Sequence, residues 1–168
     1  MSLSTFKNVL PNVHKNTFIA PGSQIIGKVT IGSGSSVWHN AVIRGDMNSV
    51  IIGNNSNIQD NAVIHVDSDH PTKIGDHVTI GHGAIIHGCK IGNNVLIGMN
   101  ATILDGAEIK DGSIVGANAL VSQGKIYPQG SLILGVPAKS VKKLSESEIS
   151  HLEEHALKYK KLWEENYK

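Results

Sequence analysis

The sequence predicts an all-β fold, a parallel β-helix followed by one α-helix, because aliphatic residues return at every sixth position along most of the chain. Strand alternation has a period of two and an amphipathic helix a period of about 3.6, so a period of six matches neither. Glycine often follows the aliphatic residue, as in Ile31-Gly32 and Ile97-Gly98, which suits a tight corner. After Pro137 the period becomes that of a helix. The aliphatic positions are Ile19, Ile25, Ile31, Val37, Ile43, Ile52, Ile58, Ile64, Ile74, Ile80, Ile86, Ile91, Ile97, Ile103, Ile109, Val115, Val121, Tyr127 and Ile133.

These positions form a ladder whose side chains point into a prism, because each hexapeptide makes one short strand and a turn. Three hexapeptides close one triangular coil, so the ladder predicts about six coils, spaced by roughly 4.8 Å. We expect residues 1–140 to form this β-helix domain. Residues 141–168 should carry a C-terminal helix that packs on the prism or on a neighbouring subunit.

The predicted helix runs from about residue 145 to residue 166, and Ser145 and Glu148 form a capping box at its start. His151 and His155 are one helical turn apart. We interpret them as solvent-facing histidines and not as a pair of metal ligands, because no third ligand lies nearby in the sequence.

Composition excludes several classes of partner and compartment. The net charge is +1 over 168 residues, so no strong field attracts nucleic acid or an anionic membrane surface. A single cysteine, Cys89, rules out an intramolecular disulfide, and we expect it to be buried and inert. The sequence shows neither a secretory apolar segment nor a membrane-spanning one, so we expect a cytoplasmic protein.

The repeat of six is broken at three places, and all three lie on the same edge of the prism. The ladder gains three residues after Ile43, gains four after Ile64 and loses one after Ile86. Insertions cluster where a repeat protein builds a site. The residues that directly follow these three positions are Arg44, His65 and His87, and we expect them to stack outside the prism.

Two imidazoles one coil apart can converge on a metal ion, so His65 and His87 are candidate co-ligands. By the same count, Asp60 and His82 occupy matching positions at a different edge, with Gln59 beside them. An edge cannot fold round to its neighbour, so His82 can join the other two only from an adjacent subunit. The count therefore predicts a homotrimer with three interfacial metal sites, each with three imidazoles and an open position for water.

With these residues placed, the chain resembles the gamma-class carbonic anhydrase family, a branch of the hexapeptide-repeat proteins. The specific matches are Arg44-Gly45-Asp46, the segment from Asn57 to Asn61, His65, and Gly81-His82 followed by His87. The resemblance covers nearly the whole chain and implies a left-handed β-helix assembled as a trimer.

The resemblance also implies roles for the site residues. His65 and His87 of one subunit and His82 of the next would hold zinc, or iron or cobalt. Arg44 and Asp46 would support subunit contacts, with Arg44 pairing with Asp60 of the neighbour. Gln59 would hydrogen-bond the solvent on the metal. A local surface ion pair of Arg44 with Asp46, worth about 0–1 kcal/mol, is the alternative.

The implied reaction is the reversible hydration of carbon dioxide to bicarbonate by a metal-bound hydroxide. The chain departs from the family at the proton shuttle, because Met47 stands where the active prototype has glutamate. The loop from Val66 to Lys73 also lacks glutamate, although Asp69 or His70 could substitute. Activity could therefore be weak.

Two other functions remain open on the sequence alone. Hexapeptide acyltransferases bind coenzyme A between subunits of the same kind of trimer and use one basic histidine. That function does not explain why His65, His82 and His87 occupy positions that converge at an interface. A noncatalytic trimer stapled by metal is the other alternative. Metal content separates acyl transfer from the other two.

Overall fold

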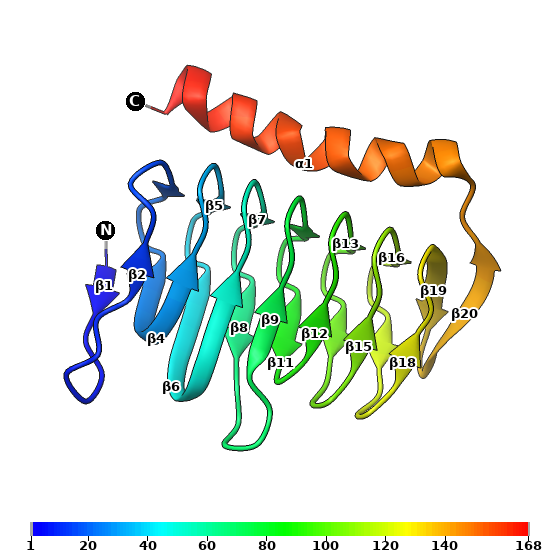
Figure 1. Cartoon of the computed structure of the whole chain (residues 1–168), viewed down its shortest axis with the longest axis horizontal. Coiled ribbons are helices and arrows are strands. Elements are labelled where there is room, and N and C mark those ends of the chain that lie inside the picture. The colour runs from blue at the N-terminus through cyan, green and yellow to red at the C-terminus, as the bar shows by residue number, and fades with distance from the viewer. Residues whose placement is uncertain (1, 168) are drawn as a thin grey trace.

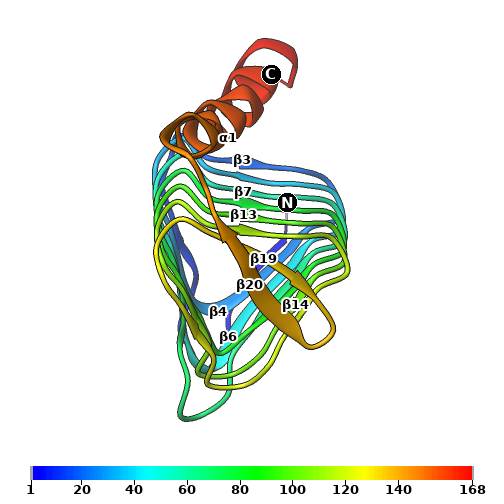
Figure 2. The ribbon, with the colours of Figure 1, turned by 90° about the vertical axis from the view of Figure 1, so that its right-hand side faces the viewer.

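The computed structural model describes residues 2–167 and shows a left-handed parallel β-helix with a single helix alongside it (Figure 1). Viewed along its axis, the β-helix has a triangular cross-section with three faces (Figure 2). We name these faces A, B and C in the order in which the chain crosses them. The predicted fold is confirmed.

Face A and face B share one sheet, because two long strands, β4 (Gln24–Ile31) and β6 (Val42–Ile52), run round the edge between them. Besides the first halves of β4 and β6, face A contains β1 (Ser2–Ser4), β8 (Val63–His65), β11 (Ile85–His87), β14 (Thr102–Ile103) and β17 (Leu120–Val121). Face B contains the second halves of β4 and β6 together with β2 (Asn12–Val13), β9 (Thr72–Ile74), β12 (Lys90–Ile91), β15 (Glu108–Ile109) and β18 (Ile126–Tyr127).

Face C is a separate sheet that shows how many coils the prism has. Its parallel strands are β3 (Phe18–Ile19), β5 (Ser36–Val37), β7 (Asn57–Ile58), β10 (Thr79–Ile80), β13 (Leu96–Ile97), β16 (Ile114–Val115) and β19 (Ser131–Gly135). Seven parallel strands mean about seven coils, one more than predicted. The additional coil is N-terminal: Leu3 pairs with Ile25 and Val13 with Ile31, and the insertion between Leu3 and Val13 hides the period of six.

The ladder fills the interior, as predicted. Ile25, Ile43, Ile64 and Ile86 are each 0% exposed and lie in register from coil to coil. Branched aliphatic side chains fit a narrow prism because they pack on a pleated surface at low rotamer cost. This continuous core rigidly positions the edges, where the polar side chains stand.

The C-terminal segment ties the last coil to the helix. Strand β20 (Ala138–Lys143) pairs antiparallel with β19, so the expected domain boundary at residue 140 falls inside a strand. Helix α1 (Glu146–Asn166) begins at the N-cap Ser145, and the predicted capping box with Glu148 is present. A hydrogen bond from Lys142, followed by hydrogen bonds from Ser145, lowers the pKa of Glu148 to about 2.

Helix α1 runs back along the prism toward its N-terminal end (Figure 1). Its residues Leu152 and Ala156 are buried, and Trp163 stacks on Phe18 with ring centroids 6.1 Å apart. His151 is exposed as expected. His155 instead is partly buried, and its Nδ1 lies 3.1 Å from Thr79 Oγ1. In residues 2–167, no helix has an apolar stretch long enough to cross a bilayer.

Candidate metal centre

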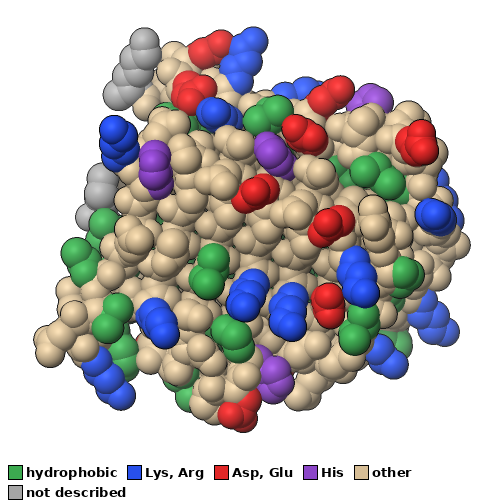
Figure 3. Space-filling model, viewed as in Figure 1, with side chains coloured by type: hydrophobic (Ala, Val, Ile, Leu, Met, Phe, Trp, Pro, Cys, Tyr) green, Lys and Arg blue, Asp and Glu red, His purple; other side chains and the backbone are tan. Residues whose placement is uncertain are grey.

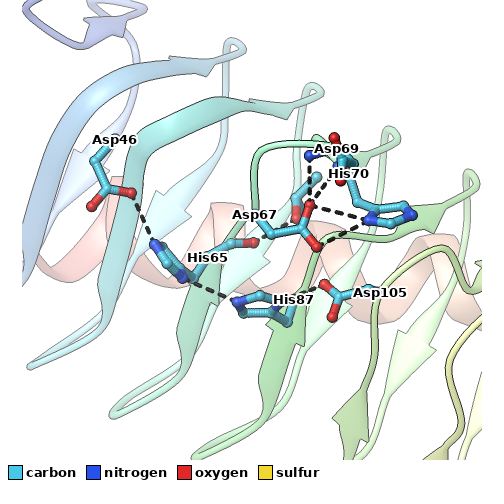
Figure 4. Close-up of polar contacts among 8 residues, drawn as sticks. Asp46, His65, Asp67, Asp69, His70, His87 and Asp105 are labelled. Atoms are coloured by element: carbon cyan, nitrogen blue, oxygen red, sulfur yellow. Dashed lines mark hydrogen bonds and ion pairs between the residues drawn. The ribbon is translucent and has the colours of Figure 1, made fainter.

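His65 and His87 stack on the edge between faces A and B, which confirms the predicted register. They are direct partners in neighbouring strands β8 and β11. His65 Nδ1 lies 3.1 Å from His87 Nε2, and the ring centroids are 5.0 Å apart (Figure 4). Each side chain is largely shielded, with 15% of His65 and 29% of His87 exposed. Two imidazoles therefore meet at one point of the A/B edge.

Asp46 holds the other nitrogen of His65, at 2.9 Å between His65 Nε2 and Asp46 Oδ1. Arg44 donates a hydrogen bond to the same carboxylate, so Arg44 and Asp46 form an ion pair within one chain. Burial favours the neutral form of Asp46, but the hydrogen bonds from His65 and Arg44 outweigh it and lower its pKa to about 2. Asp46 is therefore an anion at neutral pH.

Asp105 holds the far side of His87, and sequence reasoning missed it. His87 Nδ1 lies 2.5 Å from Asp105 Oδ1. Asp105 follows Ile103 by two residues and belongs to the next coil along the A/B edge. The repeat count could have identified Asp105, because it places this residue at the A/B edge in the coil that follows the coil of His87.

His82 lies on the edge between faces C and A, where it pairs with Asp60. His82 Nδ1 is 2.9 Å from Asp60 Oδ2, and His39 Nδ1 is 3.3 Å from Asp60 Oδ1. The matching positions predicted for Asp60 and His82 are confirmed, because the strands preceding them pair in register. Within this chain Asp60 therefore contacts two imidazoles.

Gln59, beside Asp60, is 3% exposed and is fixed by neighbours on face C. Its Nε2 donates to Asn57 Oδ1 at 3.1 Å, and Asn57 Nδ2 donates to Thr79 Oγ1 at 2.9 Å. Tyr159 of helix α1 also hydrogen-bonds the Gln59 side chain. The Gln59 amide therefore contacts face C and helix α1, on the side of the prism that carries Asp60 and His82.

The structure thus places the predicted residues in two groups on two edges, as the repeat count predicted. His65, His87, Arg44 and Asp46 share the A/B edge, whereas His82, Asp60 and Gln59 share the C/A edge. Face A separates the two groups.

The loop between β8 and β9 folds over the A/B edge beyond His87 (Figure 4). Asp67 accepts hydrogen bonds from the backbone N–H groups of Asp69 and His70 at 2.8 and 2.6 Å. His70 Nδ1 also contacts Asp67, and this hydrogen bond raises the pKa of His70 and lowers that of Asp67. Asp67, His70 and Asp105 form a polar cluster with candidate ligand atoms within 4.8 Å of one another.

Cys89, two residues after His87, is buried. Its side chain is 1% exposed, and burial raises its thiol pKa to about 12. The thiol is protonated at neutral pH, and thiolate is the form that binds metal or attacks an electrophile. The expectation of a buried cysteine is confirmed, and its inertness stays a prediction.

Comparison with known proteins identifies the family of the chain. The model for bacterial transferase hexapeptide repeats matches residues 11–45 and 88–123, and that for the hexapeptide repeat of succinyl-transferase matches residues 71–94. A protein from Methanocaldococcus jannaschii named probable carbonic anhydrase is 59% identical over 158 residues, covering 93% of this chain and 99% of the relative. The chain belongs to the gamma-class carbonic anhydrase-like family of hexapeptide-repeat proteins.

Two further relatives show how widely the family extends. The mitochondrial gamma carbonic anhydrase 1 of Arabidopsis thaliana is 44% identical, with 90% of this chain and 58% of the plant protein aligned. The crystal structure of a hexapeptide transferase family protein from Anaplasma phagocytophilum superimposes with a TM-score of 0.94 at 39% identity, covering 98% of both chains. The names of these relatives span both carbonic anhydrase and transferase.

Proposed function

We propose that this family member catalyses the reversible hydration of carbon dioxide to bicarbonate at metal sites shared between the subunits of a homotrimer. The supporting observation is the division of three candidate ligands between two edges. His65 and His87 meet at one edge and His82 stands at the other, so one chain offers two-thirds of a site at one edge and the remaining ligand at the other.

The donor set suits zinc, with iron or cobalt as alternatives. Neutral imidazole is a preferred zinc ligand, and a ligating histidine usually donates its second ring N–H to a carboxylate. Nδ1 of His82 contacts Asp60 and Nδ1 of His87 contacts Asp105. Both pairings leave Nε2 as the nitrogen available to a metal ion. Three neutral ligands fit an open catalytic site better than a closed structural one.

The surface of face A supports the trimer. Its outward side chains are uncharged and in register: Gln24, Val42, Val63, Ile85, Thr102 and Leu120. Val63 and Ile85 are 36% and 43% exposed in the single chain. Face B instead carries Lys73, Lys90 and Glu108, and basic side chains gather over β9 and β12 in Figure 3.

Face A is therefore the face suited to burial, and it lies between the two ligand-bearing edges. A ring of three subunits that joins the A/B edge of one chain to the C/A edge of the next would complete three sites. Such a ring is a closed heterologous assembly.

The chain's own residues then have distinct tasks. Asp60 orients His82, Asp46 orients His65, and Arg44 holds Asp46 while facing the neighbouring subunit. In the trimer we propose that Arg44 pairs with Asp60 of the adjacent subunit. The Gln59 amide, fixed by Asn57 and Tyr159, would hydrogen-bond solvent at the site.

The metal ion, when bound, supplies hydroxide at neutral pH by lowering the pKa of water from about 15.7 toward about 7, and hydroxide is the nucleophile that carbon dioxide requires. Each turnover also releases a proton to solvent. Met47, 60% exposed beside Asp46, cannot accept it. Asp69 and His70 are the candidates in the neighbouring loop, and slow transfer through them would make activity weak.

An acyltransferase is the second candidate function, because the matching family model and the Anaplasma structure carry transferase names. Acyl transfer with coenzyme A needs one general-base histidine and does not require three imidazoles that each contact a carboxylate. The other alternative, a noncatalytic trimer in which the metal ion only cross-links the subunits (a stapled trimer), would use the same ligands without turnover.

Metal content per chain, measured by elemental analysis of protein purified without chelators, tests the proposal. We expect about one zinc or iron per chain, lost in His65→Ala, together with carbon dioxide hydration in stopped-flow assays. Metal-free protein that cannot be reconstituted but binds coenzyme A would replace this proposal with acyl transfer. Bound metal without hydration activity would leave the stapled trimer.

A further inference from the structure

We infer that Asp105 is a positioning residue for the metal ligand His87: its carboxylate holds the ring so that Nε2 faces the metal position. This inference rests on the proposed function. Asp105 is not among the residues that the family resemblance marked. It is placed here by its 2.5 Å contact with His87 Nδ1.

Other aspartates at the corners of the coils show what Asp105 would do in a purely structural role. Asp76 Oδ1 accepts the backbone N–H of Asn54 at 2.6 Å, and Asp111 Oδ1 accepts that of Asn93 at 2.8 Å. Both contacts tie one coil to the preceding one. Asp105 Oδ1 reaches back to the preceding coil in the same way but contacts an imidazole nitrogen.

Gly88 provides the space for this contact. A Cβ at Gly88 would lie 2.3 Å from Asp105 Oδ1 and 2.9 Å from His70 Cβ, and its φ of +52° is in the left-handed region. The carboxylate therefore packs against bare backbone directly after His87. Gly53 and Gly92 give Asp76 and Asp111 the same space, so the contact with an imidazole nitrogen is what distinguishes Asp105.

The pairing has a chemical consequence for His87. A carboxylate beside Nδ1 favours the tautomer with the proton on Nδ1, which leaves the Nε2 lone pair for the metal. In the single chain this nitrogen lies 3.1 Å from His65 Nδ1, so the ring already points its ligand atom at the co-ligand. With Asp105, each of the three candidate ligands has its own carboxylate: Asp46 for His65, Asp60 for His82 and Asp105 for His87.

The test compares the zinc affinity of the full-length protein with that of Asp105→Asn and Asp105→Ala, by titration against a chromophoric chelator. Loss of a carboxylate behind a zinc ligand typically weakens binding about 10–100-fold. We expect a weakening in this range for Asp105→Ala and a smaller one for Asp105→Asn, because an amide oxygen can still accept the N–H. Asp111→Asn, at the equivalent corner position, is the matched control and should bind zinc as wild type does.

A second readout separates positioning from folding. In metal-free protein, ¹⁵N NMR of the histidine rings should show the Nδ1–H tautomer of His87 in wild type and a mixture in Asp105→Ala, with both proteins trimeric. Wild-type zinc affinity in Asp105→Ala would overturn the inference and leave the proposed function standing. Wild-type protein that binds zinc no better than His87→Ala would overturn both.

Discussion

The division of the ligands between two edges makes a numerical prediction for mixed trimers. Each proposed site takes His65 and His87 from one subunit and His82 from the next, so His65→Ala and His82→Ala homotrimers should both lack complete sites. In a mixed trimer, a complete site forms wherever a His82→Ala chain supplies the A/B edge and a His65→Ala chain supplies the C/A edge. With equal amounts and random assembly, the chance is about one half for each position, so about one quarter of all sites are restored.

The assay is to unfold and refold the two variants together, isolate trimers and measure zinc per chain and carbon dioxide hydration. Both values should return to about a quarter of wild type. A mixture of His65→Ala with His87→Ala is the control, because both changes damage the same edge and every site keeps a defect. Restoration in the control, or none in the first mixture when heterotrimers are present, would refute the division of each site between two chains.

Three further perturbations test the site and the fold. Met47→Glu, at a 60% exposed position beside Asp46, should raise the rate of carbon dioxide hydration with metal content unchanged; an equal rate means that proton transfer at this position is not limiting. Ile97→Ala removes a 0% exposed ladder side chain and should lower the free energy of unfolding by about 2–5 kcal/mol in chemical denaturation, whereas a negligible loss would contradict a close-packed ladder. Burial lowers the pKa of His155 below its ordinary 6.5, so the unfolded chain binds more protons than the folded one and stability falls as pH drops through about 6.5. The Tm of His155→Gln should therefore fall less than that of wild type between about pH 7.5 and 5.5. An equal fall would contradict this reasoning.

The fold could be predicted from local pattern because the ladder is a property of the chain itself. A period of six determines which side chains point inward, and once Ile64 and Ile86 stack, His65 and His87 must follow them in register. The capping box was also predictable from local sequence, because its two residues, Ser145 and Glu148, are three residues apart. The seventh coil was missed because an insertion before Val13 interrupts the pattern.

The partners of the histidines depended instead on contacts between coils. Asp105 reaches His87 because Gly88 leaves room for its carboxylate, and no period in the sequence specifies that side-chain direction. Asp60 contacts His39 and His82 at once because three successive coils bring them to one corner. The sequence by itself therefore determined the prism and the candidate ligands, since both follow from strand periodicity. The tertiary structure decided which carboxylate holds each imidazole, because these contacts depend on side-chain packing across coils.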